Sequence, residues 1–165
     1  MELSKKMQDA LNDQIREELY SSYLYLSMAS YCQSINLPGF AHWMKVQSEE
    51  EYEHGMKFFE YIQDRGGAVS LGAIAAPPIE WSSPAELVAE VLTHEQKVTR
   101  LINAIYAQAL KENDYPTQVM LHWFIAEQVE EESNAGSIVE MLRMVGEQPQ
   151  GLFQVDRVLA GRSGA

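Results

Sequence analysis

At residues 48–54 the chain reads Ser-Glu-Glu-Glu-Tyr-Glu-His, a segment that contains the spacing Glu51-x-x-His54. Residues three positions apart lie on one face of an α-helix, so this carboxylate and this imidazole can bind the same metal ion. Helical bundles with dinuclear iron or manganese sites use Glu-x-x-His in this way, with further carboxylates from facing helices. Four residues alone prove little, so the metal-site hypothesis depends on facing helices with matching ligands.

Composition and charge restrict the class of protein. The chain of 165 residues is long enough for one domain with a hydrophobic core, and its 46% apolar content argues against disorder. A net charge of -12 argues against nucleic acid and anionic membranes as partners. It suits a protein that attracts cations, although solubility alone would also explain it.

Cellular location is predicted from what the sequence does not contain. The single cysteine, Cys32, cannot form an internal disulfide, and we expect it to be a buried thiol. The N-terminal residues show no apolar signal core, and no apolar run is long enough to span a bilayer. We therefore expect a cytoplasmic protein.

Apolar residues recur at steps of three and four along four long stretches, which predicts four long helices. Proline at a helix start and glycine at a helix end support their limits, most clearly in Ser83-Pro84-Ala85-Glu86 and at Gly146. The expected helices, with a short fifth one, cover about residues 4–33, 39–65, 84–112, 116–145 and 150–160. We expect the glycine-rich end, residues 161–165, to be mobile.

The connections between these helices predict the topology. Residues 67–82 lack periodicity and contain Pro77-Pro78, and a connection of this length can reach the opposite end of a bundle. Two short turns and one long crossover give two helical hairpins in the ferritin-like arrangement. We therefore predict an all-α, ferritin-like four-helix bundle with a short C-terminal fifth helix, in a single domain over residues 1–165.

Polar residues interrupt the apolar seam of each long helix near its middle. They are Glu18 in the first helix, Glu51 and His54 in the second, Glu95 in the third, and Gln128 and Glu131 in the fourth. Because midpoints of antiparallel helices of similar length fall at one level, we expect these side chains to converge inside the bundle.

A cluster of buried carboxylates needs a compensating charge. Burying one unpaired carboxylate costs several kcal/mol, and four together repel one another. No Lys or Arg lies on the seams, whereas two divalent cations would balance four ionised carboxylates, with neutral His54 and Gln128 completing the shell. Such ligands suit iron or manganese. The alternative is that each acid reaches water at a helix margin, which is common for one glutamate but not for four at one level.

Residues beside the seam have two interpretations. Tyr25 lies two turns after Glu18 on the same face, and it either packs in the core or acts as a redox-active neighbour of the metals. Glu50, Glu127 and Glu130 flank the expected ligands, and they are either solvated charges or ligands of a third ion. The remaining histidines are not expected to be ligands; these are His42, His94 and His122.

Taken together, these motifs resemble those of bacterial and archaeal non-haem ferritins, from about Met7 to Leu159. The motifs are Glu18-Leu19-Tyr20-Ser21 with Tyr25, Glu50-Glu51-x-x-His54, His94-Glu95 and Trp123-x-x-x-Glu127-Gln128-x-x-Glu131. The resemblance implies iron storage with ferroxidase activity in a hollow shell of twenty-four identical subunits. There, Fe(II) is oxidised by O2 or H2O2 at a dinuclear centre and moves to a ferric mineral inside.

The resemblance also implies a role for each matching residue. Glu18, Glu51 and His54 would hold the first iron, and Glu51 would bridge to a second iron held with Glu95 and Glu131, with Gln128 close by. Glu50, Glu127 and Glu130, with Glu131, match a third iron site. Tyr25 matches a tyrosine beside the centre that is a proposed electron donor.

Three related classes of protein fit the sequence less well. Bacterioferritin repeats Glu-x-x-His, where this chain has Gln128-x-x-Glu131, and it binds haem through a methionine, where this chain has Tyr52, so we expect no haem. A non-storing diiron oxidase or peroxidase of the rubrerythrin kind usually carries a Cys-x-x-Cys iron site, which one cysteine cannot form. In a non-catalytic helical binding protein the seam acids would be dispensable.

Overall fold

The structure is a computed structural model that describes residues 2–164, so Met1 and Ala165 of the predicted domain lie outside it. The described residues form five helices and no strand. The helices are α1 (Lys5–Ser34), α2 (Pro38–Asp64), α3 (Pro84–Glu112), α4 (Tyr115–Val145) and α5 (Pro149–Ala160). The predicted all-α bundle, with its crossover and short last helix, is confirmed. None of the described helices is both long enough and apolar enough to cross a bilayer.

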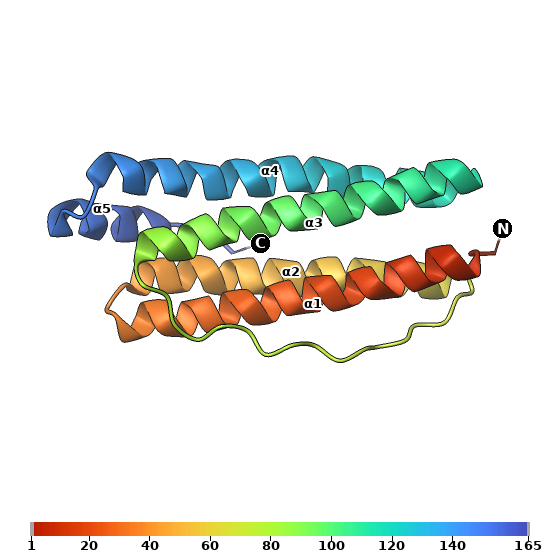
Figure 1. The fold of residues 1–165 in the computed structure, drawn as a ribbon, viewed down its shortest axis with the longest axis horizontal. Coiled ribbons are helices and arrows are strands. Elements are labelled where there is room, and N and C mark those ends of the chain that lie inside the picture. Colours follow the sequence, from red (N-terminus) through yellow and green to blue (C-terminus); the bar gives the residue numbers. More distant parts are fainter. Residues whose placement is uncertain (1, 165) are drawn as a thin grey trace.

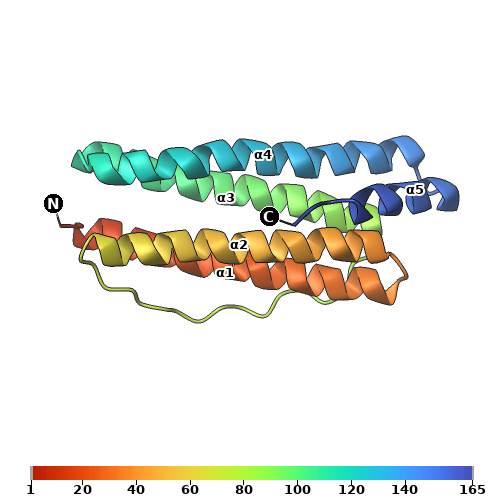
Figure 2. The same ribbon diagram turned by 180° about the vertical axis from the view of Figure 1, so that it is seen from behind.

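Two antiparallel hairpins, α1–α2 and α3–α4, lie side by side (Figures 1 and 2). The crossover between α2 and α3 runs the length of the bundle along α1, which returns the chain to the end where α3 begins. Side chains of α1 hold it there: Asn12, Ser27 and Tyr31 donate hydrogen bonds to the carbonyls of residues 68, 78 and 81. The crossover makes α2 and α3 parallel, so all four long helices share one midpoint level.

The helix starts follow the expected local chemistry. Ser83 caps α3 by accepting from the backbone N–H of Glu86 at 3.1 Å, and Pro84 occupies the first turn. Between α3 and α4, Asn113 adopts a left-handed conformation with φ of 56°, which reverses the chain within a few residues. These short turns fix the register of each hairpin.

A polar layer divides the hydrophobic core into two parts. One cluster, which includes Tyr25, Phe40 and Met44, lies towards the α1–α2 turn, and the other, which includes Phe58 and Leu121, lies towards the α3–α4 turn. Between them, the helices present acids, amides and one histidine to the interior. The two apolar clusters hold the helices on both sides of this layer.

Helix α5 packs across the start of α2. Asp156 of α5 accepts a hydrogen bond from the backbone N–H of Phe40 at 3.0 Å, which satisfies a free donor at the N-terminus of α2. A Cβ on Gly39 would lie 1.7 Å from the carbonyl oxygen of Asp156, so only glycine permits this approach. After α5 the chain returns to α2, where Arg162 contacts Trp43. The prediction that this end is mobile is therefore wrong at Arg162, because its side chain finds partners on another helix.

Candidate metal centre

Six predicted ligand side chains from all four long helices meet in the polar layer. They are Glu18 of α1, Glu51 and His54 of α2, Glu95 of α3, and Gln128 and Glu131 of α4. None of the six is more than 5% exposed. The alternative that these acids reach water at helix margins therefore does not hold for the metal-free fold.

The ligand atoms form two groups that share Glu51. Glu18, Glu51 and His54 each offer one ligand atom within 4.8 Å of the others, and so do Glu51, Glu95 and Glu131. One carboxylate common to two three-ligand groups is the arrangement that allows two adjacent metal ions to be bridged. The arrangement is thus compatible with two cations side by side.

Two oxygen atoms in this layer lack a hydrogen-bond partner. Glu18 Oε2 and Glu51 Oε2 are buried and unpaired, although Glu51 Oε2 lies 3.3 Å from Nδ1 of His54. Leaving a buried carboxylate oxygen unsatisfied is costly, and a cation at this point would remove that cost. The unpaired atoms belong to two of the three residues in the group of Glu18, Glu51 and His54, which supports a metal site there.

Neutral donors hold the other oxygens of the carboxylates. Gln14 donates to Glu18 Oε1 at 2.8 Å, and Gln47 donates to Glu51 Oε1 at 3.2 Å. These amides orient the carboxylates without supplying positive charge, so the layer stays electrically uncompensated. This role of Gln14 was not predicted from the sequence, although its position one helical turn before Glu18 was a usable signal.

Glu95 and Glu131 are oriented in the same manner from neighbouring helices. The buried Tyr25 hydroxyl donates to Glu95 Oε1, and Gln128 donates to Glu95 Oε2 at 3.2 Å. Gln47 donates a second bond, of 2.7 Å, to Glu131 Oε2. One amide of α2 thereby connects carboxylates on two helices.

Burial raises the pKa of every carboxyl group in the centre. For Glu18 and Glu51 the pKa lies well above the ordinary value, first because of burial and then because of neighbouring carboxylates. Burial is also the main reason that the pKa of Glu95 and that of Glu131 are each raised to about 7. The metal-free centre therefore retains protons near neutral pH, and incoming cations displace them.

His94 lies behind the ligands and is no part of either group. Its Nε2 lies 2.7 Å from the Ser21 hydroxyl, and its ring stands edge-on to Tyr25 at 5.8 Å. Burial, with a further effect from Lys97, lowers the pKa of His94 to about 4, so the imidazole is neutral at physiological pH. We infer that it supports the packing of Tyr25.

The residues expected to hold a third ion are only partly brought together. Glu127 joins His54 and Glu131 in another group with ligand atoms within 4.8 Å. Glu130 is exposed, and Glu50 pairs with Arg162. Among the residues described, neither Glu50 nor Glu130 belongs to a group of metal-binding size.

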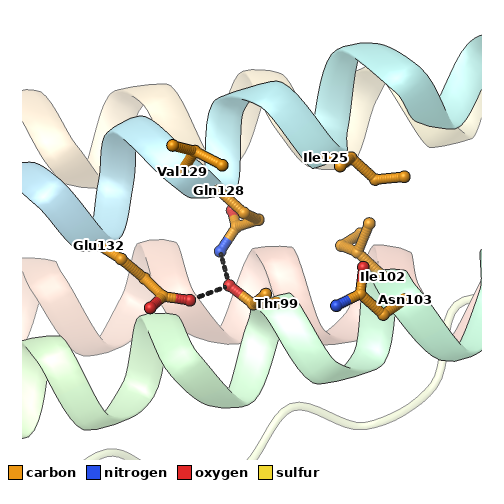
Figure 3. A pocket seen from close by; sticks show the side chains of 7 residues that line it. All are labelled: Thr99, Ile102, Asn103, Ile125, Gln128, Val129 and Glu132. Atoms are coloured by element: carbon orange, nitrogen blue, oxygen red, sulfur yellow. Dashed lines mark hydrogen bonds between the residues drawn. The ribbon is translucent and has the colours of Figure 1, made fainter.

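A surface pocket of about 300 Å³ lies between α3 and α4 beside the centre (Figure 3). It is lined by Thr99, Ile102, Asn103, Ile125, Gln128, Val129 and Glu132. Gln128 donates to the Thr99 hydroxyl, which donates to Glu132 at 2.6 Å, as Figure 3 shows. Gln128 also donates a hydrogen bond to Glu95, so its side chain both lines the pocket and contacts the centre.

A model of the ferritin-like domain family matches residues 8–145. The chain belongs to the ferritin family. The bacterial non-heme ferritin of Bacteroides fragilis (strain 638R) is 41% identical to it over 160 residues, covering 97% of this chain and 99% of that one. The bacterial non-heme ferritin of Staphylococcus aureus (strain USA300) is 37% identical over 161 residues, covering 98% and 97%.

Solved ferritin structures agree with this assignment. The open pore ferritin from the hyperthermophilic archaeon Archaeoglobus fulgidus has 48% sequence identity and a TM-score of 0.97, with 98% of both chains covered. A humanized archaeal ferritin has 47% identity and the same TM-score, with 99% of both chains covered. The resemblance to prokaryotic non-haem ferritins is thus confirmed.

The raised pKa values predict how the stability of this ferritin depends on pH. The folded chain binds protons at Glu95 and Glu131 that the unfolded chain, with a pKa near 4.5, releases. Stability of the metal-free protein is therefore lost as pH rises from about 4.5 through about 7, by roughly 3 kcal/mol for each group. We expect the melting temperature of metal-free protein to fall between about pH 5 and pH 8.

Saturating Zn(II) should reverse this trend, because its stabilisation grows as the carboxyl groups lose their protons. The Glu95→Gln variant is the matched control, since an amide cannot titrate and its share of the slope should vanish. A melting temperature of metal-free protein that rises over this pH range would contradict the assignment.

Proposed function

We propose that this ferritin oxidises Fe(II) at the buried carboxylate centre and stores the ferric product. Membership of the ferritin family supports iron storage with ferroxidase activity, and the carboxylate and histidine cluster is compatible with a diiron site. The observation that carries the proposal is Glu51, which belongs to two ligand groups at once. A site of this form holds two irons close enough to share one oxidant.

Each ligand has a proposed role. One iron is held by Glu18, Glu51 and His54. Glu51 bridges to the second iron, which is also held by Glu95 and Glu131 and has Gln128 beside it. Carboxylates stabilise the more highly charged ferric state over the ferrous state, which lowers the potential and favours oxidation. The proposed oxidant is O2 or H2O2.

We propose that Tyr25 supplies an electron to the reaction. Its hydroxyl is fully buried and donates directly to Glu95. Burial, then the charge of Glu95, raises the pKa of Tyr25 well above its usual value, so the residue is a neutral phenol before it reacts. The alternative role is to orient Glu95 alone.

We further propose that the chain self-associates into a shell of twenty-four subunits in the cytoplasm. The similarity to ferritins over nearly the whole chain supports self-association. Large apolar side chains exposed on the subunit also suit burial in an assembly, among them Leu26 at 50% exposed and Ile79 at 75% exposed.

Replacing a seam acid should separate iron chemistry from folding. We expect Glu18→Leu and Glu95→Leu each to slow Fe(II) oxidation by at least about tenfold, as measured by absorbance after mixing with air. The metal-free variants should keep their thermal stability, because each substitution replaces a buried carboxyl group with an apolar side chain of similar size. Glu60→Leu, on the exposed side of α2, is the matched control and should oxidise iron at the parent rate. Parent rates in both seam variants would refute the dinuclear assignment.

The role of Tyr25 can be tested by removing its hydroxyl. We expect Tyr25→Phe to bind Fe(II) with the parent stoichiometry but to oxidise it several-fold more slowly, and to lose any tyrosyl radical signal in electron paramagnetic resonance. If oxidation slows while a radical signal persists, Tyr25 only orients Glu95. Tyr31→Phe is the control, because the Tyr31 hydroxyl bonds to the crossover and not to a ligand. This variant should oxidise Fe(II) at the parent rate.

A further inference from the structure

Arg162 connects the end of the chain to the edge of the metal centre. Its guanidinium lies over the Trp43 ring, 4.5 Å from the ring centroid, and donates to Gln47 Oε1 at 2.8 Å. A second nitrogen forms an ion pair with Glu50. The Arg162 side chain is 17% exposed and that of Glu50 is 20% exposed, so the pair is largely withdrawn from water.

The main chain around Arg162 is also held in place. The Arg162 carbonyl oxygen lies 2.7 Å from Nε2 of His42, a residue of α2. In α5, the Asp156 carboxylate accepts a hydrogen bond from the backbone N–H of Phe40 at the N-terminus of α2. This bond fixes how α5 lies against α2, and so where the chain continues after α5. Arg162 is therefore held by its main chain as well as by its side chain.

Glu50 stands next to the acids that surround the dinuclear ligands. Burial is the main reason that the pKa of Glu50 is raised, and the charge of Glu127 adds to it. Burial likewise raises the pKa of Glu131 most, and the charge of Glu50 adds to it, so all three carboxylates lie within electrostatic reach. A guanidinium remains protonated at every physiological pH. The Glu50 side of this acidic cluster thus already holds one permanent cation.

Arg162 also determines how Gln47 faces the centre. Because a guanidinium has only donors, Gln47 must present its carbonyl oxygen to Arg162 and its amide nitrogen to the opposite side. That nitrogen donates to Glu51 and Glu131, the two carboxylates that serve the proposed iron pair. Arg162 accordingly contacts both the ligand layer, through Gln47, and the flanking acid.

We propose that Arg162 is a positioning residue that acts as a built-in cation: it occupies Glu50, and a third metal ion next to the dinuclear centre gains Glu50 as a ligand only by displacing it. The inference rests on the proposed iron-oxidising function. It gives the end of the chain a role in limiting the number of ions that each subunit binds tightly.

Calorimetric titration of the assembled full-length protein with Fe(II) under anaerobic conditions tests this proposal. Arg162→Met removes the charge but keeps an apolar side chain against Trp43. We expect two tight Fe(II) ions per chain in the parent and in the variant, and a third ion whose affinity rises about tenfold or more in the variant, since a charge-assisted bond no longer competes. Arg157→Met is the matched control, because Arg157 lies on the exposed side of α5. The third-ion affinity of this variant should equal that of the parent.

A double-mutant cycle identifies the residue through which Arg162 acts. In a Glu50→Gln background the arginine has no carboxylate to occupy, so Arg162→Met should leave the third-ion affinity unchanged. A chain that ends at Gly161 removes the cation in a second way, and we expect it to show the same gain in third-ion affinity. It replaces Arg162→Met as the test if that variant folds poorly.

Three outcomes would overturn the proposal. They are an unchanged third-ion affinity in the folded Arg162→Met protein, an equal gain in Arg157→Met, and a gain that persists in the Glu50→Gln background. A parent protein that binds no Fe(II) at all would instead refute the proposed function, so the two failures are distinguishable.

Discussion

One electrostatic feature governs this structure: four carboxylates lie buried at one level of a helical bundle, and no Lys or Arg lies among the proposed ligands. Two of their oxygens, Glu18 Oε2 and Glu51 Oε2, have no hydrogen-bond partner. Such a layer would be eliminated from a purely structural core, because apolar side chains of similar size are more stable there. It is retained at the cost of stability, as is typical of a functional site.

The rest of the fold keeps this layer intact. Apolar clusters on both sides prevent the helices from separating to admit water, and the crossover along α1 aligns the four midpoints. Amides and hydroxyls orient the carboxylates without neutralising them, as Gln14 does for Glu18 and Tyr25 for Glu95. Because these donors add no positive charge and fix the geometry of the carboxyl groups, the layer is suited to binding cations.

The parts of this account that the sequence predicts are those set by local periodicity. Helix limits follow from capping residues and from proline in the first turn, and the convergence of Glu18 with Glu51 and Glu95 follows from mid-helix positions in helices of similar length. Contacts between distant segments were not predictable in this way. The glycine-rich end of the chain indicated mobility, whereas Arg162 is held by partners about 112 residues away, such as Glu50. His94 is likewise neutral because it is buried against another helix, where its Nε2 lies 2.7 Å from the Ser21 hydroxyl of α1.

The most direct test of the account adds Fe(II) to metal-free protein without oxygen, then admits air, while absorbance and particle mass are recorded. The account predicts saturable binding of two or three irons per chain, rapid oxidation, and then slower uptake of a large ferric load into a particle of many subunits. Binding and oxidation without that later load would indicate a diiron enzyme in a ferritin-like fold. An absence of Fe(II) binding would show that the buried acids are structural and would contradict the central claim.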